Sequence, residues 1–269
     1  MVKCRPNDMD NSQWQIYAVR YAHHERTARE NFLGGDPHDE SPMPMDYFVW
    51  ALVSGGRIVA VDTGFAEPMA RKRGRIYLKP PGEGLKAIGI DSTKVKDVLI
   101  THMHYDHCGN DDLFPAARYH VQDREMRFVT GRSMCHSFTR FPFEEDDVAA
   151  MVRRLFNGRV VFHDGDEEIA PGVSVHHVGG HTMGMQIVRV NTRRGWVVLA
   201  SDASHYYANM ERELPYPIAY NVAEVMEGYR RAYALASSRE HVIPGHDPLV
   251  LDRYPAAAPE LKGWVVRLD

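Results

Sequence analysis

The sequence predicts a single large domain in which α-helices and β-strands are mixed. Short runs of β-branched and aromatic residues are scattered along the chain and bounded by Gly, Pro and Asp, which is typical of strands. Two longer segments repeat apolar residues at helical spacing. No linker-like segment divides the 269 residues, so one domain spanning residues 1–269 is expected.

The first strands are expected to form a hairpin. Residues 47–54 and 57–62 are rich in Val, Ile and aromatic residues, and Gly55 and Gly56 between them suit a two-residue turn. Residues 97–100 form a short apolar run that leads into a histidine cluster. Later strand candidates share this composition and cover residues 159–163, 173–178, 185–190, 196–201 and 241–244.

Two helices are expected, at residues 146–156 and 221–236. Acidic residues suit the start of the first helix, and Asn221 suits the N-cap of the second. The apolar positions that recur at helical spacing are Val148, Met151, Val152, Leu155 and Phe156, and then Val222, Val225, Met226, Tyr229 and Tyr233.

Two long stretches carry no clear pattern of secondary structure. Residues 20–46 are rich in His, Pro and Asp, and residues 66–92 in Gly, Pro and Lys. Long irregular segments are often functional loops, so residues 1–46 are expected to be an extension or loop over the site. The basic run at residues 70–75, ARKRGR, is interpreted first as a solvated loop, with a clamp for an anionic substrate as the alternative.

Charge and composition exclude several classes of partner. The formal net charge of −4 gives no basic footprint for nucleic acid, and no apolar run approaches the length of a membrane span. The first residues lack the apolar core of a signal peptide, and three widely spaced cysteines favour free thiols in a reducing compartment. A cytoplasmic protein without nucleic-acid or membrane partners is therefore expected.

Residues 100–110, ITHMHYDHCGN, carry a dense group of metal-ligand residue types. His102 and His104 are two residues apart and can converge on one ion, whereas Asp106 and His107 follow and suit a second ion. Imidazole and carboxylate donors together favour zinc, with iron or manganese as alternatives.

Three further ligand-type residues follow predicted strands. VSVHHVGGHT reaches His181 after a Gly-Gly turn, WVVLASD ends in Asp202, and HVIPGH ends in His246. Strand ends at one edge of a sheet are where active sites of α/β proteins usually lie. All seven residues are therefore expected along one rim.

The HxHxDH cluster, the later His, Asp and His, and the VDTG at residues 61–64 resemble the metallo-β-lactamase superfamily over residues 47–247. The resemblance implies an α+β fold, a four-layer αβ/βα sandwich with a dinuclear metal site between its two sheets. It implies that Asp62 supports a ligand by hydrogen bonding. The ligands that it implies are His102, His104 and His181 for the first ion, Asp106, His107 and His246 for the second, and Asp202 for both.

Two such ions lower the pKa of a water between them and supply hydroxide at neutral pH. That hydroxide can attack a carbonyl or phosphoryl centre. Asp106 is the best-placed group to carry the proton to the leaving atom, which makes it a predicted catalytic residue. Hydrolysis is therefore the expected reaction.

The segment LASDASHYY at residues 199–207 resembles the N-acyl-homoserine lactonase branch, in which SDAS is followed by a tyrosine that contacts the lactone carbonyl. His205 stands at that tyrosine's position here, and Tyr206 follows. Because an imidazole can also donate a hydrogen bond, His205 is a predicted catalytic and substrate-binding residue, with Tyr206 as a second substrate contact. A lactonase acting on a small lactone or ester is the preferred interpretation.

Other functions of the same fold remain open. A thioesterase of the glyoxalase II type shares all seven ligands, but the C-terminal residues offer only Lys262 and Arg267 for an anionic thiol carrier. Iron-dependent redox enzymes rank lower; diiron flavoproteins usually carry Glu where His104 stands. A non-catalytic metal-binding protein ranks last. The metal, the substrate ring and the formation of a homo-oligomer are left open by the sequence.

Overall fold

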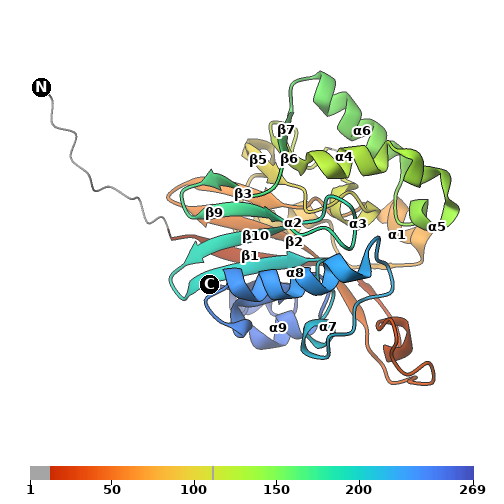
Figure 1. Ribbon diagram of the computed structural model, residues 1–269. Coiled ribbons are helices and arrows are strands. Elements are labelled where there is room, and N and C mark those ends of the chain that lie inside the picture. The colour runs from red at the N-terminus through yellow and green to blue at the C-terminus, as the bar shows by residue number, and fades with distance from the viewer. Residues whose placement is uncertain (1–12, 111) are drawn as a thin grey trace, which may run out of the picture.

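The computed structural model describes residues 13–110 and 112–269, and two β-sheets packed face to face form its centre (Figure 1). The first sheet has the order β13-β1-β2-β3-β5-β6-β7, with β4 pairing with β1. Its strands are β1 Gln15–His24, β2 Met45–Ser54, β3 Arg57–Val61, β4 Ile76–Tyr77, β5 Asp97–Leu99, β6 Arg118–Gln122, β7 Val160–His163 and β13 Val265–Arg267.

The second sheet has the order β12-β11-β10-β9-β8. Its neighbouring strands pair antiparallel except for β11 and β12, which are parallel. The strands are β8 Glu167–Ala170, β9 Val173–His177, β10 Gln186–Thr192, β11 Gly195–Ser201 and β12 Val242–Pro244.

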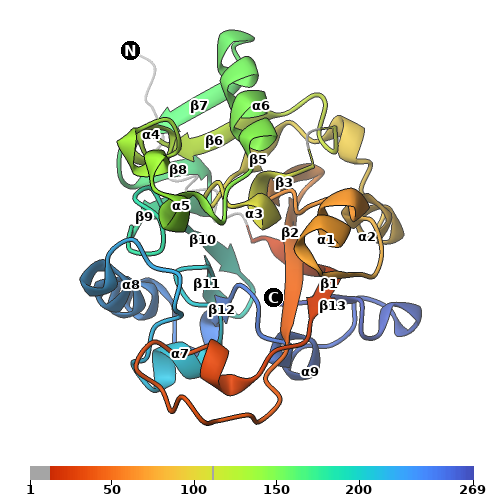
Figure 2. The same cartoon turned by 90° about the vertical axis from the view of Figure 1, so that its right-hand side faces the viewer.

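Helices cover the outer faces of both sheets, with α8 beside the second sheet and α1 and α2 beside the first (Figure 2). The α-helices are α1 Glu67–Arg73, α2 Pro81–Ala87, α3 Tyr105–Cys108, α4 Asp123–Val129, α5 Ser137–Arg140, α6 Glu145–Phe156, α7 Tyr207–Glu211, α8 Val222–Leu235 and α9 Leu249–Arg253. Short 3-10 helices span Ala28–Glu30, Ser92–Lys94, Arg132–Cys135, Arg239–His241 and Pro259–Leu261. None of the helices described is long and apolar enough to span a membrane.

Strand β2 shows why the layers stack in this way. Successive side chains of a strand point to opposite faces. Phe48, Trp50 and Leu52 pack in the core between the two sheets, whereas Tyr47 and Val49 pack against the helices that cover the first sheet. Because both faces are buried there, the run from Tyr47 to Leu52 is apolar throughout. The fold is the four-layer αβ/βα sandwich that the sequence predicts.

The predicted hairpin is confirmed. Ser54 pairs with Arg57 across the turn, and Gly55 and Gly56 both have positive φ angles, of 52° and 87°. A two-residue turn with both φ angles positive matches the twist of the flanking strands and favours glycine. The later predicted strands are confirmed as β5, β7 and β9 to β12.

Both predicted helices are present, as α6 and α8. The side chain of Asn221 caps α8 by accepting a hydrogen bond from the backbone N–H of Ala223. The assignment of Phe156 to the apolar face of α6 is wrong, because 86% of this side chain is exposed. The buried face of α6 runs instead through Ala150, Met151 and Arg154, which turns the last residue outward.

The expectation of an irregular N-terminal segment is only partly right. Residues 1–12 lie outside the described residues, and Gln15–His24 is strand β1, hydrogen-bonded to β2 and β13. A register shift between Arg20 and Ala22 interrupts its pairing with β2, and burial of both faces removes the polar alternation that marks an ordinary strand. Helices α1 and α2 likewise occupy much of residues 66–92.

Candidate metal centre

The proposed ligands follow the strands as the sequence predicts. The His cluster comes after β5, Asp202 directly follows β11, and His246 follows β12. His181 lies in the turn between β9 and β10, where Gly180 has a φ of 82°. A Cβ on Gly180 would lie 2.5 Å from the backbone nitrogen of Val225, so the turn can approach α8 only because this residue is glycine. Donors from both sheets therefore meet at one edge.

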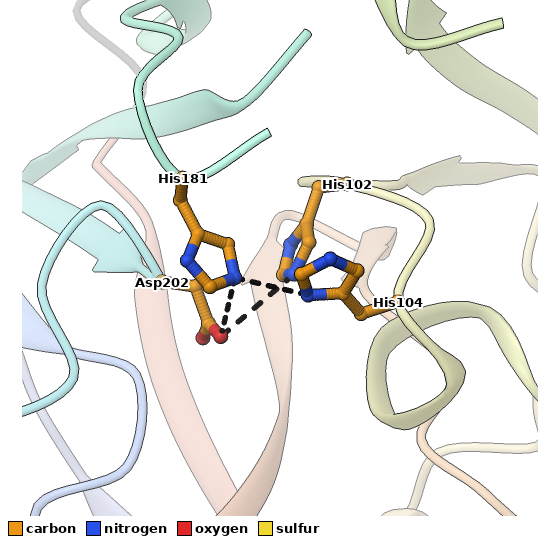
Figure 3. A group of neighbouring side chains, drawn as sticks. All are labelled: His102, His104, His181 and Asp202. Atoms are coloured by element: carbon orange, nitrogen blue, oxygen red, sulfur yellow. Dashed lines mark hydrogen bonds and ion pairs between the residues drawn. The ribbon is translucent and has the colours of Figure 1, made fainter. Parts of the chain in front are cut away.

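The structure brings together the residues assigned to the first ion. His102, His104, His181 and Asp202 offer donor atoms that all lie within 4.8 Å of one another (Figure 3). His181 Nε2 is 3.0 Å from His104 Nδ1 and 3.2 Å from Asp202 Oδ2. His102 Nε2 is 3.7 Å from the same carboxylate oxygen. One carboxylate oxygen and three imidazoles thus surround one point.

The residues assigned to the second ion also meet. The donor atoms of Asp106, His107 and His246 lie within 4.8 Å of one another. The other oxygen of Asp202, Oδ1, is 3.2 Å from His107 Nε2 and 2.8 Å from His246 Nε2. Asp202 therefore faces one group with Oδ2 and the other with Oδ1, which is the arrangement that a bridging ligand requires.

Hydrogen bonds at the far ring nitrogen orient three of the histidines. The acceptors lie 2.7–2.8 Å from Nδ1 in each case; they are Asp62 Oδ2 for His107, the carbonyl of Ile218 for His181, and the carbonyl of Asp46 for His246. Such a bond fixes the tautomer, so that Nε2 presents its lone pair to the centre.

Asp62 supports this side of the centre, as the resemblance implies. Its carboxylate accepts hydrogen bonds from the backbone N–H and the hydroxyl of Thr101, both at 2.8 Å, besides the bond from His107. Asp62 has a φ of 61°, and Ser201, directly before Asp202, has a φ of 45°. Two non-glycine residues in this strained region, both next to proposed ligands or their supports, mark a site whose geometry the surrounding fold enforces.

Unpartnered buried atoms test whether a cation fits here. The Nε2 atoms of His102, His107 and His246 and Oδ1 of Asp202 are buried without a hydrogen-bond partner. Each such atom costs about 1–3 kcal/mol if it stays unsatisfied. Four such atoms in the two neighbouring donor groups, all of metal-ligand type, fit divalent cations.

The electrostatics of the centre favour positive charge. Burial and the neighbouring imidazoles lower the pKa of His102 well below its ordinary value, so its ring is neutral and can ligate. Burial also lowers the pKa of His107, but Asp202 and Asp106 outweigh it and raise that pKa well above the ordinary value. Burial raises the pKa of Asp202, yet the surrounding imidazoles, His205 first, bring it well below the usual range. The Asp202 carboxylate is therefore ionised and attracts a cation.

Glu125 is a buried residue of the centre that the sequence analysis missed. Its Oε1 accepts a hydrogen bond from Met103 N at 2.8 Å, and its Oε2 accepts bonds from Thr182 Oγ1 at 2.7 Å and Gly184 N at 3.0 Å. One carboxylate therefore ties the His cluster to the His181 turn. In the sequence it is one acid on a short helix, which looks like an ordinary surface residue.

A cavity of about 170 Å³ opens onto the centre. His205 lines it, with its ring stacked on Tyr216 at 3.6 Å between centroids and its Nε2 3.0 Å from Asp202 Oδ2. Burial lowers the pKa of His205 to about 3, so the ring is neutral. The expectation for Tyr206 is not met: this residue does not line the cavity, and its hydroxyl lies 3.5 Å from the carbonyl of Met43. Tyr206 is the N-cap of α7.

Aromatic and basic residues complete the cavity wall. Tyr47, Tyr105 and Tyr216 supply aromatic surface, and Arg26 and Arg75 supply positive charge. Arg26 belongs to the segment after β1, so that part of the N-terminal region does reach the site. A larger groove of about 670 Å³ beside α1, α5 and α6 includes none of the proposed ligands.

The sequence profile of the family described as Metallo-beta-lactamase superfamily matches residues 44–259. An N-acyl homoserine lactonase of Bacillus sp. is 29% identical over 133 residues, which is 49% of this chain and 48% of the relative. The chain thus spans about half the length of that curated relative.

Solved structures show the same fold at low sequence identity. One is an N-acyl homoserine lactone hydrolase with the product N-hexanoyl-L-homoserine bound at its catalytic metal center; it has a TM-score of 0.68 and 20% identity, covering 87% of this chain and 93% of that chain. Another is AidC, a dizinc quorum-quenching lactonase in complex with its product, with a TM-score of 0.67 and 12% identity, covering 88% and 91%.

Proposed function

The chain belongs to the metallo-beta-lactamase superfamily, and on that premise we propose that it is a dinuclear metal-dependent hydrolase that opens the ester bond of a small lactone. The observation that carries the proposal is the position of Asp202, which offers one carboxylate oxygen to each of two donor groups at the wall of a cavity. A site that holds two cations side by side beside a substrate cavity is suited to hydrolysis.

The donor sets define the proposed cofactor. Imidazole and carboxylate donors without a thiolate favour two zinc ions, with iron or manganese as alternatives. When bound, the ions supply Lewis acidity towards a carbonyl oxygen and hydroxide at neutral pH. The proposed ligands are His102, His104 and His181 for one ion, Asp106, His107 and His246 for the other, and Asp202 for both.

Two residues of the cavity wall have proposed roles in ring opening. Asp106 lies at the wall beside the donors, where its carboxylate can carry a proton to the ring oxygen as the C–O bond breaks. His205 is neutral and held by its stack on Tyr216, so a ring N–H can donate a hydrogen bond to the substrate carbonyl. Hydrolysis adds one water, breaks the ring ester bond and leaves a carboxylate, a hydroxyl and a proton.

The size of the cavity and the relatives support a small lactone. Pockets for drug-sized ligands measure roughly 300–1,000 Å³. The cavity here is about 170 Å³, which suits a small ring with short substituents. The relatives and structural neighbours named above are lactonases, and product lies at the metal center of one of them.

Reconstitution with zinc and a substrate panel test the proposal. The panel contains γ-butyrolactone derivatives, N-hexanoyl homoserine lactone, S-lactoylglutathione and a chromogenic β-lactam, with proton release as the readout and metal content measured in parallel. We expect turnover of lactones by protein that holds two ions per chain. Turnover of the thioester alone, with every lactone left intact, would overturn the lactonase proposal in favour of a glyoxalase II-like thioesterase.

A further inference from the structure

We propose that Arg26 and Arg75 form an anion-binding subsite in the wall of the metal cavity, which selects a lactone that carries a free carboxylate. The inference rests on the proposed function of the same cavity and names the class of substrate that it takes. The two arginines come from different segments, one after β1 and one after α1, and both side chains line the cavity.

Arg75 is aimed at the cavity by the end of α1. Helix α1 ends at Arg73, and Gly74 takes a left-handed conformation with a φ of 64°, which redirects the chain. The Arg75 guanidinium then donates hydrogen bonds to the Tyr105 hydroxyl at 3.1 Å and to the Arg73 carbonyl at 2.7 Å, and lies 3.1 Å from His24 Nε2. These partners hold the group in place without neutralising it.

Arg26 is held in a similar way. Its Nε donates to the side-chain oxygen of Asn31 at 2.8 Å, and its Nη2 donates to the backbone carbonyl of Glu30 at 2.8 Å. The carboxylate of Glu30 is engaged elsewhere, since it accepts hydrogen bonds from the backbone N–H and hydroxyl of Thr27. The guanidinium lies 5.4 Å from the ring centroid of Tyr216, the residue on which His205 stacks. Arg26 is thus positioned by neutral groups close to the reacting centre.

The basic run at residues 70–75 separates into two parts in the structure. Arg71 pairs with Glu67, and Lys72 and Arg73 both pair with Glu144. Within residues 13–110 and 112–269, by contrast, no carboxylate lies within 4 Å of the guanidinium of Arg26 or Arg75. The two arginines that line the cavity therefore have no carboxylate in contact among the described residues, whereas Arg71, Lys72 and Arg73 of the basic run do.

His24 lies close enough to both Arg26 and Arg75 to be affected by the charge of each. Its half-buried ring has a pKa lowered to about 4, by burial first and then by Arg75 and Arg26. It is neutral at physiological pH and adds no charge of its own. Asp106 is a carboxylate that acts on Arg75, and because it is one of the proposed ligands its charge would be shared with a bound cation. Two guanidinium groups therefore act together at this wall of the cavity.

A carboxylate on the substrate is the complement to this wall. The remaining N–H groups of Arg26 and Arg75 can donate charge-assisted hydrogen bonds to such a carboxylate. One such interaction changes affinity on the order of 10- to 100-fold. An uncharged N-acyl homoserine lactone would leave both guanidinium groups without a counter-ion, so we expect it to be a poor substrate.

The test uses the zinc-loaded full chain and two substrates with the same ring: 5-oxotetrahydrofuran-2-carboxylate and its uncharged primary amide. We expect kcat/KM to be on the order of 10- to 100-fold higher for the carboxylate, mainly through a lower KM. Arg26→Gln and Arg75→Gln should each lower the ratio of kcat/KM for the carboxylate to kcat/KM for the amide about tenfold. Arg71→Gln removes an exposed cation of the same basic run and should leave the ratio as it is.

A binding measurement separates this inference from the lactonase proposal. Calorimetry compares two ring-opened acids, 2-hydroxyglutarate and 4-hydroxybutyrate, which differ by one carboxylate. Tighter binding of the dicarboxylate, lost in Arg26→Gln and largely kept in Arg75→Lys, supports the subsite even if no lactone is turned over. Lactone turnover with equal kcat/KM for the charged and uncharged substrates, and equal binding of the two acids, would overturn the subsite while the lactonase proposal stands. If Arg75→Gln does not fold, Arg26→Gln decides, because it lies on a separate segment.

Discussion

The floor and the wall of the cavity are built in different ways. The floor consists of the seven proposed ligands, which sit at or soon after the ends of β5, β9, β11 and β12 and are almost completely buried. The upper wall consists of Arg26, Arg75, His205 and Tyr216, which lie in connections between elements, and both arginines are partly exposed. The floor is held by two sheets, and the upper wall by local turns and caps.

The floor and the upper wall are therefore expected to have different roles, the floor in metal binding and the upper wall in substrate selectivity. Donor atoms must stay within a few tenths of an ångström of their positions to hold a cation, and buried strand ends provide that precision. Binding loops vary more easily, because few buried contacts depend on them. Changes in the floor should therefore remove metal and activity together, whereas changes in the upper wall should alter kinetics and leave the metal bound.

The largest effect is expected from the ligands themselves. Asp202→Ala removes the carboxylate that faces both donor groups, and His104→Ala removes one imidazole of the first group. Both variants should lose bound metal and more than about 100-fold in kcat/KM, since even residues that only orient ligands cost 10- to 100-fold. Metal content per chain, measured by elemental analysis, is the check. Full metal content in both variants would contradict the proposed ligand set.

A smaller loss is expected from Glu125, which ties two parts of the floor together. In Glu125→Gln one acceptor oxygen becomes an NH₂ group that faces a donor, so unfolding free energy should fall by about 1–3 kcal/mol. Metal affinity should fall about 10- to 100-fold, because the ligand segments lose their common support. Glu83→Gln, at an exposed acid of α2, is the matched control. Equal thermal stability and metal affinity in the two variants would show that Glu125 does not hold the floor.

Substitution of His205 tests whether this residue contacts the substrate, as part of the upper wall, or holds metal, as part of the floor. With a role at the substrate carbonyl, His205→Ala should lower kcat about tenfold and leave metal content unchanged. His205→Tyr, which restores the tyrosine of the lactonase branch, should recover part of the loss. Tyr206→Phe should not change the kinetics, because Tyr206 does not line the cavity and its hydroxyl lies 3.5 Å from the Met43 carbonyl. Metal loss in His205→Ala would instead assign His205 to the floor, in keeping with its closeness to Asp202 and His246.

The smallest effect is expected outside both regions. Asn221→Ala removes the side-chain cap of α8, which should cost about 1 kcal/mol of stability and lower the melting temperature by about 2–4 °C. Metal content and kcat/KM should stay at wild-type values. A change in either would mean that α8 positions the His181 turn through more than its packing at Gly180.

The sequence predicts the floor well and the upper wall poorly, for physical reasons. His181, Asp202 and His246 each follow an apolar strand, so strand ends alone place them at one edge. The environment of Arg75 depends on where α1 ends and on the φ of Gly74, which a basic run does not reveal. Glu125 could not be identified because its importance comes from three donors that are distant in the sequence.

Tertiary packing also determines which residues of a helix or strand are buried, and sequence periodicity alone does not predict this. Phe156 has helical spacing but is exposed, because Arg154, not Phe156, lies on the buried face of α6. Strand β1 was missed because it is buried on both faces and its register with β2 shifts after Arg20. In both cases the deciding contact comes from another element.

The origin of the donors in two sheets has a consequence for assembly of the fold. His102 and His107 follow a strand of the first sheet, whereas Asp202 and His246 follow strands of the second, and more than half of the chain separates the outermost of them. Cations bound by the two proposed donor groups would cross-link the sheets, and they would stabilise only chains in which the sheets have already docked. Because such distant contacts form late in folding, metal uptake during refolding should mark the final docking step.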